Sequence, residues 1–240
     1  MPYSNFVRTI EYRRVVLALF ALAFISTPQV GVAQAAATQT SQKKIEEMDL
    51  EEARRAFLED PIAPTIKPKG YDVIIVEYMD YQCPSCRASL VPLKQLLLKD
   101  KKVRIIFRDW PIFGPASERA ARVAIASQWQ GKHTQFHDAL MTVARPLTEV
   151  KIKVAAKKAG VDWPRLEKDL KMHALDIEAL LERNDDQAQS LGLEGTPGFI
   201  IGNVQSFGGM DLPALRKAVE RARREAKNPG KIVPSQPEGI

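Results

Sequence analysis

The two cysteines of this chain, Cys83 and Cys86, are its best candidates for chemistry, and the sequence contains no others. Pro84 and Ser85 separate them. Two thiols at this spacing can form and break one disulfide, and so exchange it with the thiols of another molecule. A disulfide that closes so small a loop constrains little of the unfolded chain. The spacing therefore favours a working dithiol over a structural bridge.

The segments around the pair predict that it lies at the start of a helix. The apolar run Val73–Met79 is typical of a strand buried on both faces, and residues 86–99 have helical periodicity. Pro92 lies inside that helix and is expected to kink it. Residues 103–107 form a second apolar run, so the three segments predict a right-handed βαβ unit with parallel strands.

At the start of a helix, the first sulfur of the pair meets unpaired backbone N–H groups and the positive end of the helix dipole. Both favour thiolate over thiol, so the pKa of Cys83 should fall below about 8.5. We expect Cys83 to be the exposed nucleophile and Cys86 to be the more buried thiol that resolves the mixed disulfide. Glu77, in the preceding strand, is either a buried carboxylate that exchanges a proton with Cys86 or a strand-end residue that faces solvent.

The rest of the chain predicts a helical block followed by a hairpin and a last helix. Residues 116–191 have helical patterns, and residues 199–201 and Val204–Phe207 flank a Gly-Asn turn. Asp211 can cap a last helix that ends near Lys227. The order β-α-β, helical block, β-β-α predicts an α/β thioredoxin fold with a helical insertion between the second strand and the hairpin. The expected helices of the block are residues 117–130, 133–144, Glu149–Ala159, 164–173 and 175–191.

The N-terminal residues predict export. Three arginines at residues 8–14 precede an apolar run, residues 15–25, that is too short to span a bilayer comfortably. Small residues follow, with an Ala-x-Ala cleavage pattern at residues 33–35. We expect a signal peptide at residues 1–35, with an uncleaved anchor as the alternative, and a mature protein in the periplasm.

We divide the mature chain into an N-terminal tail and helix (36–60), a thioredoxin-like domain (61–227) and a flexible tail (228–240). Residues 43–58 read as a helix that either docks on the domain or forms a short oligomerisation stalk. The net charge is +6, and no stretch combines basic with aromatic residues, which argues against a nucleic-acid partner.

A metal-binding module is an alternative of a different class. His133 and His137 lie one helical turn apart, so with Cys83 and Cys86 they supply the ligand types of a Cys₂His₂ zinc site. The two pairs are much further apart than in usual structural zinc sites. The histidines are otherwise a solvated or satisfied helix face. Copper(I) on the reduced thiols is a softer alternative, because thiolates select it.

Three segments resemble the DsbA-like thiol–disulfide oxidoreductases, including their suppressor-of-copper-sensitivity relatives. They are Val-Glu-Tyr-Met-Asp-Tyr-Gln-Cys-Pro-Ser-Cys at residues 76–86, Pro-Ile-Phe-Gly-Pro at 111–115 and Gly-Thr-Pro-Gly-Phe at 195–199. The resemblance covers about residues 60–226. It implies that Pro197 is cis and lies opposite the dithiol, where the Thr196 backbone can pair with an extended substrate strand.

The resemblance implies an oxidase that needs no cofactor, passes its disulfide to exported proteins and is reoxidised by a membrane partner. An oligomeric isomerase or reductase is the close alternative, and a binding protein without turnover is a third. The strongest oxidants of the family carry His where this chain has Ser85, so we expect a less oxidising potential. Tyr81, Phe113 and Phe199 are candidates either for a groove beside the dithiol or for the core.

Overall fold

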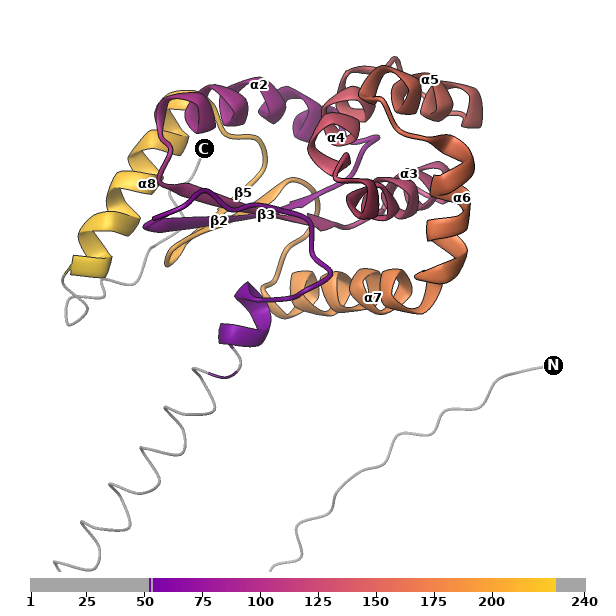
Figure 1. Ribbon diagram of the computed structural model, residues 1–240. Coiled ribbons are helices and arrows are strands. Elements are labelled where there is room, and N and C mark those ends of the chain that lie inside the picture. Colours follow the sequence, from indigo (N-terminus) through magenta and orange to yellow (C-terminus); the bar gives the residue numbers. More distant parts are fainter. Residues whose placement is uncertain (1–51, 53, 228–240) are drawn as a thin grey trace, which may run out of the picture. The chain divides into compact units, whose positions relative to one another are not determined.

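The computed structural model describes residue 52 and residues 54–227, so the expected signal peptide, most of the 43–58 helix and the C-terminal tail lie outside the described residues. The described chain contains a mixed sheet in the order β1-β3-β2-β4-β5 (Figure 1). β2 and β3 are parallel, as the sequence predicts, and the other strand pairs are antiparallel. The strands are β1 Thr65–Ile66, β2 Val73–Met79, β3 Val103–Asp109, β4 Gly198–Ile201 and β5 Val204–Phe207.

Helices cover both faces of this sheet (Figure 1). Ile75 and Phe107 face α2 and α8, and the Phe107 ring also lies 4.6 Å from the His137 ring of α4. On the opposite face, the Tyr78 hydroxyl donates a hydrogen bond of 3.1 Å to Gln187 of α7. The helices are α2 Pro84–Lys99, α3 Pro115–Ala126, α4 His133–Thr142, α5 Glu149–Ala159, α6 Trp163–Met172, α7 Ala174–Ser190 and α8 Leu212–Lys227, with a 3₁₀ turn at Ser127–Gln130.

The helices from α3 to α7 form the helical insertion between β3 and β4. Their buried residues, such as Phe136 of α4 and Leu180 of α7, join Tyr78 of the sheet in one apolar core. The side chains of Thr148 and Asp162 accept hydrogen bonds at the N-termini of α5 and α6, which fixes where these helices begin. This arrangement confirms the predicted thioredoxin fold with a helical insertion.

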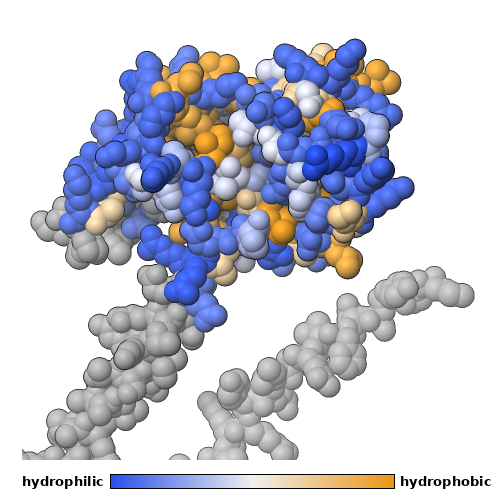
Figure 2. All heavy atoms as spheres, viewed as in Figure 1, coloured by the Kyte–Doolittle hydropathy of each residue, from blue (hydrophilic) through white to orange (hydrophobic). Residues whose placement is uncertain are grey.

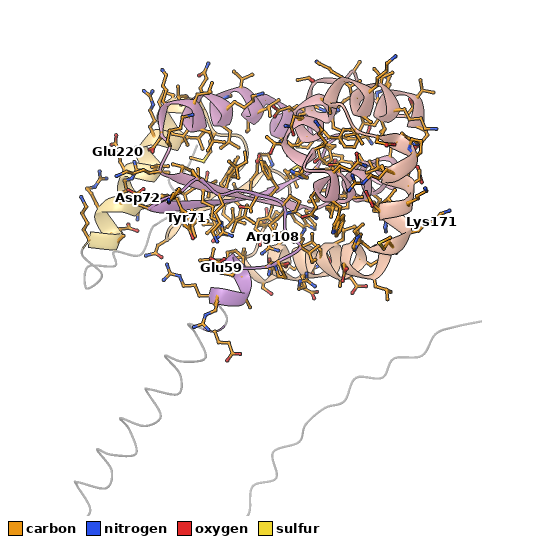
Figure 3. The ribbon with its side chains drawn as sticks, in the orientation of Figure 1. Glu59, Tyr71, Asp72, Arg108, Lys171 and Glu220 are labelled. Carbon is orange, nitrogen blue, oxygen red and sulfur yellow. The ribbon has the colours of Figure 1, made fainter. Side chains whose placement is uncertain are left out.

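A buried ion pair fastens the N-terminal part of the domain to the sheet. The fully buried Arg108 of β3 donates to Asp60 and to Asn184 of α7, each at 3.1 Å. Asp60 also accepts a bond of 3.0 Å from Arg183. Arg108 is labelled in Figure 3, near Glu59. Because removal of one partner from a buried pair costs about 3–5 kcal/mol, these bonds hold residues 57–60 against β3 and α7.

Some element boundaries differ from those that the sequence predicts. The strand β1 is not predicted, because it has only two residues and lies between prolines. β3 continues past Phe107 to Asp109. The prediction ends at Phe107 because the buried polar residues at the end of the strand interrupt the apolar pattern. α2 begins at Pro84 rather than Cys86 and continues through Pro92 as one helix.

The visible surface is mostly hydrophilic (Figure 2). Small hydrophobic groups interrupt it over α2 and α5, where Val91, Leu98, Val150 and Val154 are exposed. Among the described residues, no helix is both long enough and apolar enough to cross a membrane.

Candidate active site

The first thiol lies at the N-cap of α2. Cys83 has the extended backbone of an N-cap residue, and Pro84 begins the helix, where its missing N–H costs nothing. The Cys83 Sγ accepts a hydrogen bond of 3.4 Å from the backbone N–H of Cys86. The structure therefore places this sulfur against the free amides of a helix N-terminus, as the sequence predicts.

The second contact of Cys83 comes from the loop before β4. The Thr196–Pro197 peptide is cis, as the family resemblance implies. The Cys83 thiol donates a hydrogen bond of 3.1 Å to the carbonyl oxygen of Thr196. Cys83 is only 3% exposed, so the expectation of an exposed nucleophile is wrong. The contact with the Thr196 carbonyl accompanies this burial, and Cys86 is buried as well, at 1%.

The two thiols are chemically unequal. A hydrogen bond from the Cys86 thiol is the main cause that lowers the pKa of Cys83 to about 5. The Thr196 side chain and the backbone amides of residues 85 and 86 lower it further, against the cost of burial. Burial, and then the contact with Cys83, raise the pKa of Cys86 far above its ordinary value. The site thus holds a thiolate next to a thiol that keeps its proton. Ser85 contributes its backbone amide to this stabilisation.

A buried carboxylate shapes the loop that carries Cys83. Asp80, which is 1% exposed, accepts hydrogen bonds from the Gln82 amide at 2.6 Å and from the Phe113 amide at 3.0 Å. It also accepts one of 2.7 Å from the Ser117 hydroxyl. Asp80 therefore joins the dithiol loop to the loop between β3 and α3. The sequence motif contains Asp80 but does not reveal this role.

A second junction ties the dithiol loop to the segment between α4 and α5. The Gln82 side chain accepts a bond of 2.9 Å from the Leu147 amide, and its carbonyl accepts one of 2.7 Å from Arg145. Arg87 of α2 donates to the carbonyl of Tyr81 at 2.6 Å and to that of Val143. These contacts hold the helical insertion beside Cys83. Apart from the bond between Arg87 and Tyr81, they join residues far apart in the chain, so no local pattern predicts them.

Glu77 is buried, at 2% exposure, which decides against the solvent-facing alternative. Burial, and repulsion from the nearby Asp109 carboxylate, raise its pKa to about 8. Asp109, at the end of β3, is 1% exposed, and its pKa is likewise raised to about 8, mainly by burial. The sequence prediction ends this strand at Phe107 and so misses Asp109. No hydrogen bond between Glu77 and Cys86 is found among residues 54–227, so the proton exchange expected between them stays a prediction.

The family model of the DSBA-like thioredoxin domain matches residues 74–220. The chain belongs to the DsbA-like thioredoxin-domain family. The matched residues include the dithiol, the helical insertion and the Thr196–Pro197 bond.

The relatives agree with this membership. A thioredoxin-like oxidoreductase of Silicibacter pomeroyi DSS-3 is 36% identical, with 71% of this chain and 98% of that one covered and a TM-score of 0.68. The probable disulfide bond formation protein D of Bacillus anthracis is 29% identical over 62% of this chain and 73% of its own length. The catalytic domain of Proteus mirabilis ScsC shares the fold, with 24% identity, coverage of 73% of this chain and 97% of that one, and a TM-score of 0.64. The Na(+)/H(+) antiporter NhaA 3 of Salinispora tropica is 27% identical over 67% of this chain, but the match spans only about a quarter of the antiporter.

In this DsbA-like domain the histidine pair belongs to the core. His133 and His137 are 6% and 3% exposed, and the Tyr81 hydroxyl lies 3.3 Å from Nδ1 of His137. Burial lowers the pKa of both imidazoles, to about 4 for His137. Across residues 54–227, no three His, Cys, Asp or Glu side chains are grouped so that they could hold a metal ion. The Cys₂His₂ alternative therefore lacks its site, and the histidines are not a solvated helix face.

The three aromatic candidates for a groove have separate positions in the DsbA-like fold. Tyr81 and Phe199 are buried in the core, at 1% and 0% exposure. Phe113 is 49% exposed, next to the exposed Ile112, and its amide is bonded to Asp80. The surface beside the dithiol loop therefore includes an apolar pair, Ile112 and Phe113, and not the three aromatics together.

Proposed function

We propose that this chain is an exported thiol–disulfide oxidoreductase that passes a Cys83–Cys86 disulfide to proteins of the periplasm. The observation that supports it most is the environment of the Cys83 sulfur, which accepts a hydrogen bond from the Cys86 amide at the start of α2 and has a pKa lowered to about 5. A sulfur that is stable as thiolate is a good leaving group. A substrate thiolate can therefore resolve a mixed disulfide readily when Cys83 is the sulfur that leaves.

The reaction follows from the inequality of the two thiols. A substrate thiolate attacks the Cys83 sulfur of the enzyme disulfide, the bond to Cys86 breaks, and Cys86 leaves as a thiolate. Cys86 then takes up a proton, since its pKa is raised by burial. A second substrate thiolate attacks the substrate sulfur of the mixed disulfide, and Cys83 leaves as a thiolate. The substrate loses two electrons to the dithiol, which the disulfide of a membrane partner then reoxidises.

We assign Glu77 as the group that gives this proton to Cys86. Its carboxyl is buried on the sheet face that α2 covers, and its pKa of about 8 keeps it protonated near neutral pH. The transfer runs directly or through one hydrogen-bonded water, as general acids commonly act. Thr196 and Pro197 would meet the substrate backbone opposite Cys83, and Ile112 and Phe113 offer apolar contact beside it.

Redox titration of the purified mature protein against glutathione tests the proposal. We expect one reversible two-electron couple from Cys83 and Cys86, and oxidation of a reduced model substrate by the disulfide form. Cys83→Ser should abolish the exchange, whereas Cys86→Ala should accumulate the mixed disulfide. Exchange that survives in Cys83→Ser, or a disulfide that never forms, would contradict the proposal. Export predicts that the mature protein begins at Ala36, which N-terminal sequencing of the periplasmic fraction checks.

An oligomeric isomerase or reductase is the second candidate. It needs Cys83 to persist as a thiolate, and the lowered pKa of Cys83 supplies that. The deciding quantity is the mass of the mature protein in solution, because oligomerisation would bring several dithiols to one substrate. A dimer or trimer that dissociates when residues 36–54 are removed favours the isomerase. A monomer, together with oxidation of substrates and no repair of scrambled disulfides, favours the oxidase.

A further inference from the structure

Two buried carboxyl groups lie together on the sheet face beneath α2. Glu77 pairs with Phe107 in the parallel ladder, and Asp109 follows Phe107 by two residues, so both side chains project from the same face. No hydrogen bond of normal geometry reaches Asp109 Oδ1, Asp109 Oδ2 or Glu77 Oε2 from the described residues. A looser contact with the Tyr81 hydroxyl lowers the pKa of Asp109, but burial outweighs it. Cys86 of α2 is buried in the same cluster as Met79, the residue opposite Asp109.

No positive charge of the described residues is among the causes that set the pKa of Glu77 or of Asp109. Arg108, the strand neighbour of Asp109, points to the opposite face and binds Asp60. The two imidazoles of α4 are kept neutral by burial, which lowers their pKa. The Asp80 carboxylate adds repulsion that raises the pKa of Asp109 further. The titratable groups around the pair include Asp80 and Tyr81 after β2, Cys86 of α2, and His133 and His137 of α4. Arg87 of α2 donates to the Tyr81 carbonyl and interacts with Asp80, and the ion pair of Lys94 and Asp138 lies at the outer edge of α2 and α4.

Near neutral pH, two carboxyl groups in such a site are not both ionised, so the pair keeps at least one proton, and when it holds only one the two groups share it. We propose that Asp109 is a positioning residue that shares a proton with Glu77 and sets the pH range in which Glu77 can serve Cys86. This inference rests on the proposed thiol–disulfide exchange and goes beyond it, because it assigns a second acid to the same step.

The proton balance of the step is simple. When the Cys83–Cys86 bond breaks, the leaving Cys86 thiolate takes a proton from Glu77, and the pair passes from two protons to one. The remaining proton is shared between Glu77 and Asp109, which stabilises the new charge on the pair. In the reverse direction, the pair takes the proton from Cys86 as its sulfur attacks the mixed disulfide. No other donor or oxidant is needed.

Carboxyl-carbon NMR titration of the reduced full-length mature protein tests the sharing. In the wild type, the Glu77 carboxyl should follow two macroscopic steps, because it is coupled to Asp109. In Asp109→Asn, Glu77 should titrate in one step, with the upper pKa lowered by about one unit, since repulsion is lost and burial remains. The alkaline limb of the exchange rate should move in the same direction by the same amount.

Asp186→Asn is the matched control, because Asp186 is exposed on α7, on the other side of the sheet. It should leave both the Glu77 titration and the rate profile unchanged. If Asp109→Asn does not fold by circular dichroism, Glu77→Gln gives the reciprocal test through the Asp109 carboxyl. A Glu77 titration that is identical in wild type and Asp109→Asn overturns the inference while the exchange activity stands. Absence of exchange in the wild type overturns the proposed function, but the titration still decides whether the proton is shared.

Discussion

At the scale of the residue, the reactivity of Cys83 comes mainly from its partner thiol. The hydrogen bond from Cys86 is the largest favourable influence on the Cys83 thiolate, ahead of the Thr196 side chain and the backbone amides. The sequence predicts the helix N-terminus and its amides but not this order of importance, because the distance between the two sulfurs depends on how α2 begins. The low pKa is therefore a property of the pair as much as of the helix.

Replacement of Cys86 tests this order. Cys86→Ala removes the donor, so we expect the pKa of Cys83 to rise by about one to two units. Cys86→Ser keeps a hydroxyl donor at the same place and should give a smaller rise. The absorbance of the thiolate near 240 nm, followed from pH 3 to 10, measures both. A Cys83 pKa that stays at the wild-type value in both variants would mean that the Cys86 thiol does not stabilise the thiolate.

Ser85 is the second residue whose effect can be measured. Its backbone amide already stabilises the Cys83 thiolate, but its side chain adds no charge. Ser85→His would place an imidazole there, and we expect the pKa of Cys83 to fall by about one unit. One unit corresponds to about 1.4 kcal/mol in favour of the reduced form, or a potential about 30 mV more oxidising. Ser85→Ala serves as the control, and a glutathione equilibrium that does not move in Ser85→His would show that this position does not set the potential.

At the scale of the element, the loops around Cys83 are positioned by hydrogen bonds that the sequence does not announce. The strand, helix and hairpin that carry the dithiol and Pro197 follow from apolar periodicity and turn residues. Asp80, Gln82 and Arg87 lie within or beside the motif, yet their partners are distant in the chain. Patterns of local spacing locate the elements, whereas side-chain contacts across the fold determine how their loops meet.

Asp80 gives a test at this scale. Asp80→Ala leaves two backbone amides and the Ser117 hydroxyl without their acceptor, so we expect the free energy of unfolding to fall by about 3 kcal/mol. Ser117→Ala removes only one of these bonds and should cost about 1 kcal/mol. Urea unfolding measures both, and faster hydrogen exchange at the Phe113 amide in Asp80→Ala reports the release of the loop. If both variants lost the same stability, Asp80 would not be the common acceptor.

At the scale of the whole molecule, polar groups in the core join parts that the chain separates. Arg108 links the segment at residue 60 to β3 and α7, and Glu77 and Asp109 lie beneath α2. Composition and periodicity predict the apolar core, the layers and the order of elements. They cannot predict a buried ionisable group, because Arg108 and Asp109 look like ordinary polar residues that follow the predicted strand. The fold could thus be read from the sequence more fully than the acid pair beneath the active site.

The acid pair should also be visible in the stability of the molecule. The pKa of each acid is raised to about 8 in the folded protein, from 4.5 for Glu77 and 3.8 for Asp109. Between those values the folded state binds more protons than the unfolded state, so their contribution to stability is complete at acid pH and is lost as pH rises through 8. Cys83 and the buried histidines, whose pKa values are lowered, change stability in the opposite direction. The difference between a variant and the wild type isolates the acids from these groups.

Asp109→Asn removes one of the two acids, so its unfolding free energy should rise relative to the wild type by at least about 1 kcal/mol between pH 5 and pH 8. Urea unfolding of the reduced proteins at several pH values in this range measures the difference. Asp186→Asn, which removes an exposed carboxylate, should follow the wild type in parallel. A parallel curve for Asp109→Asn would mean that Asp109 is ionised in the folded protein at pH 5. That outcome would contradict the prediction, because a buried carboxylate without a cation beside it is far more stable with its proton.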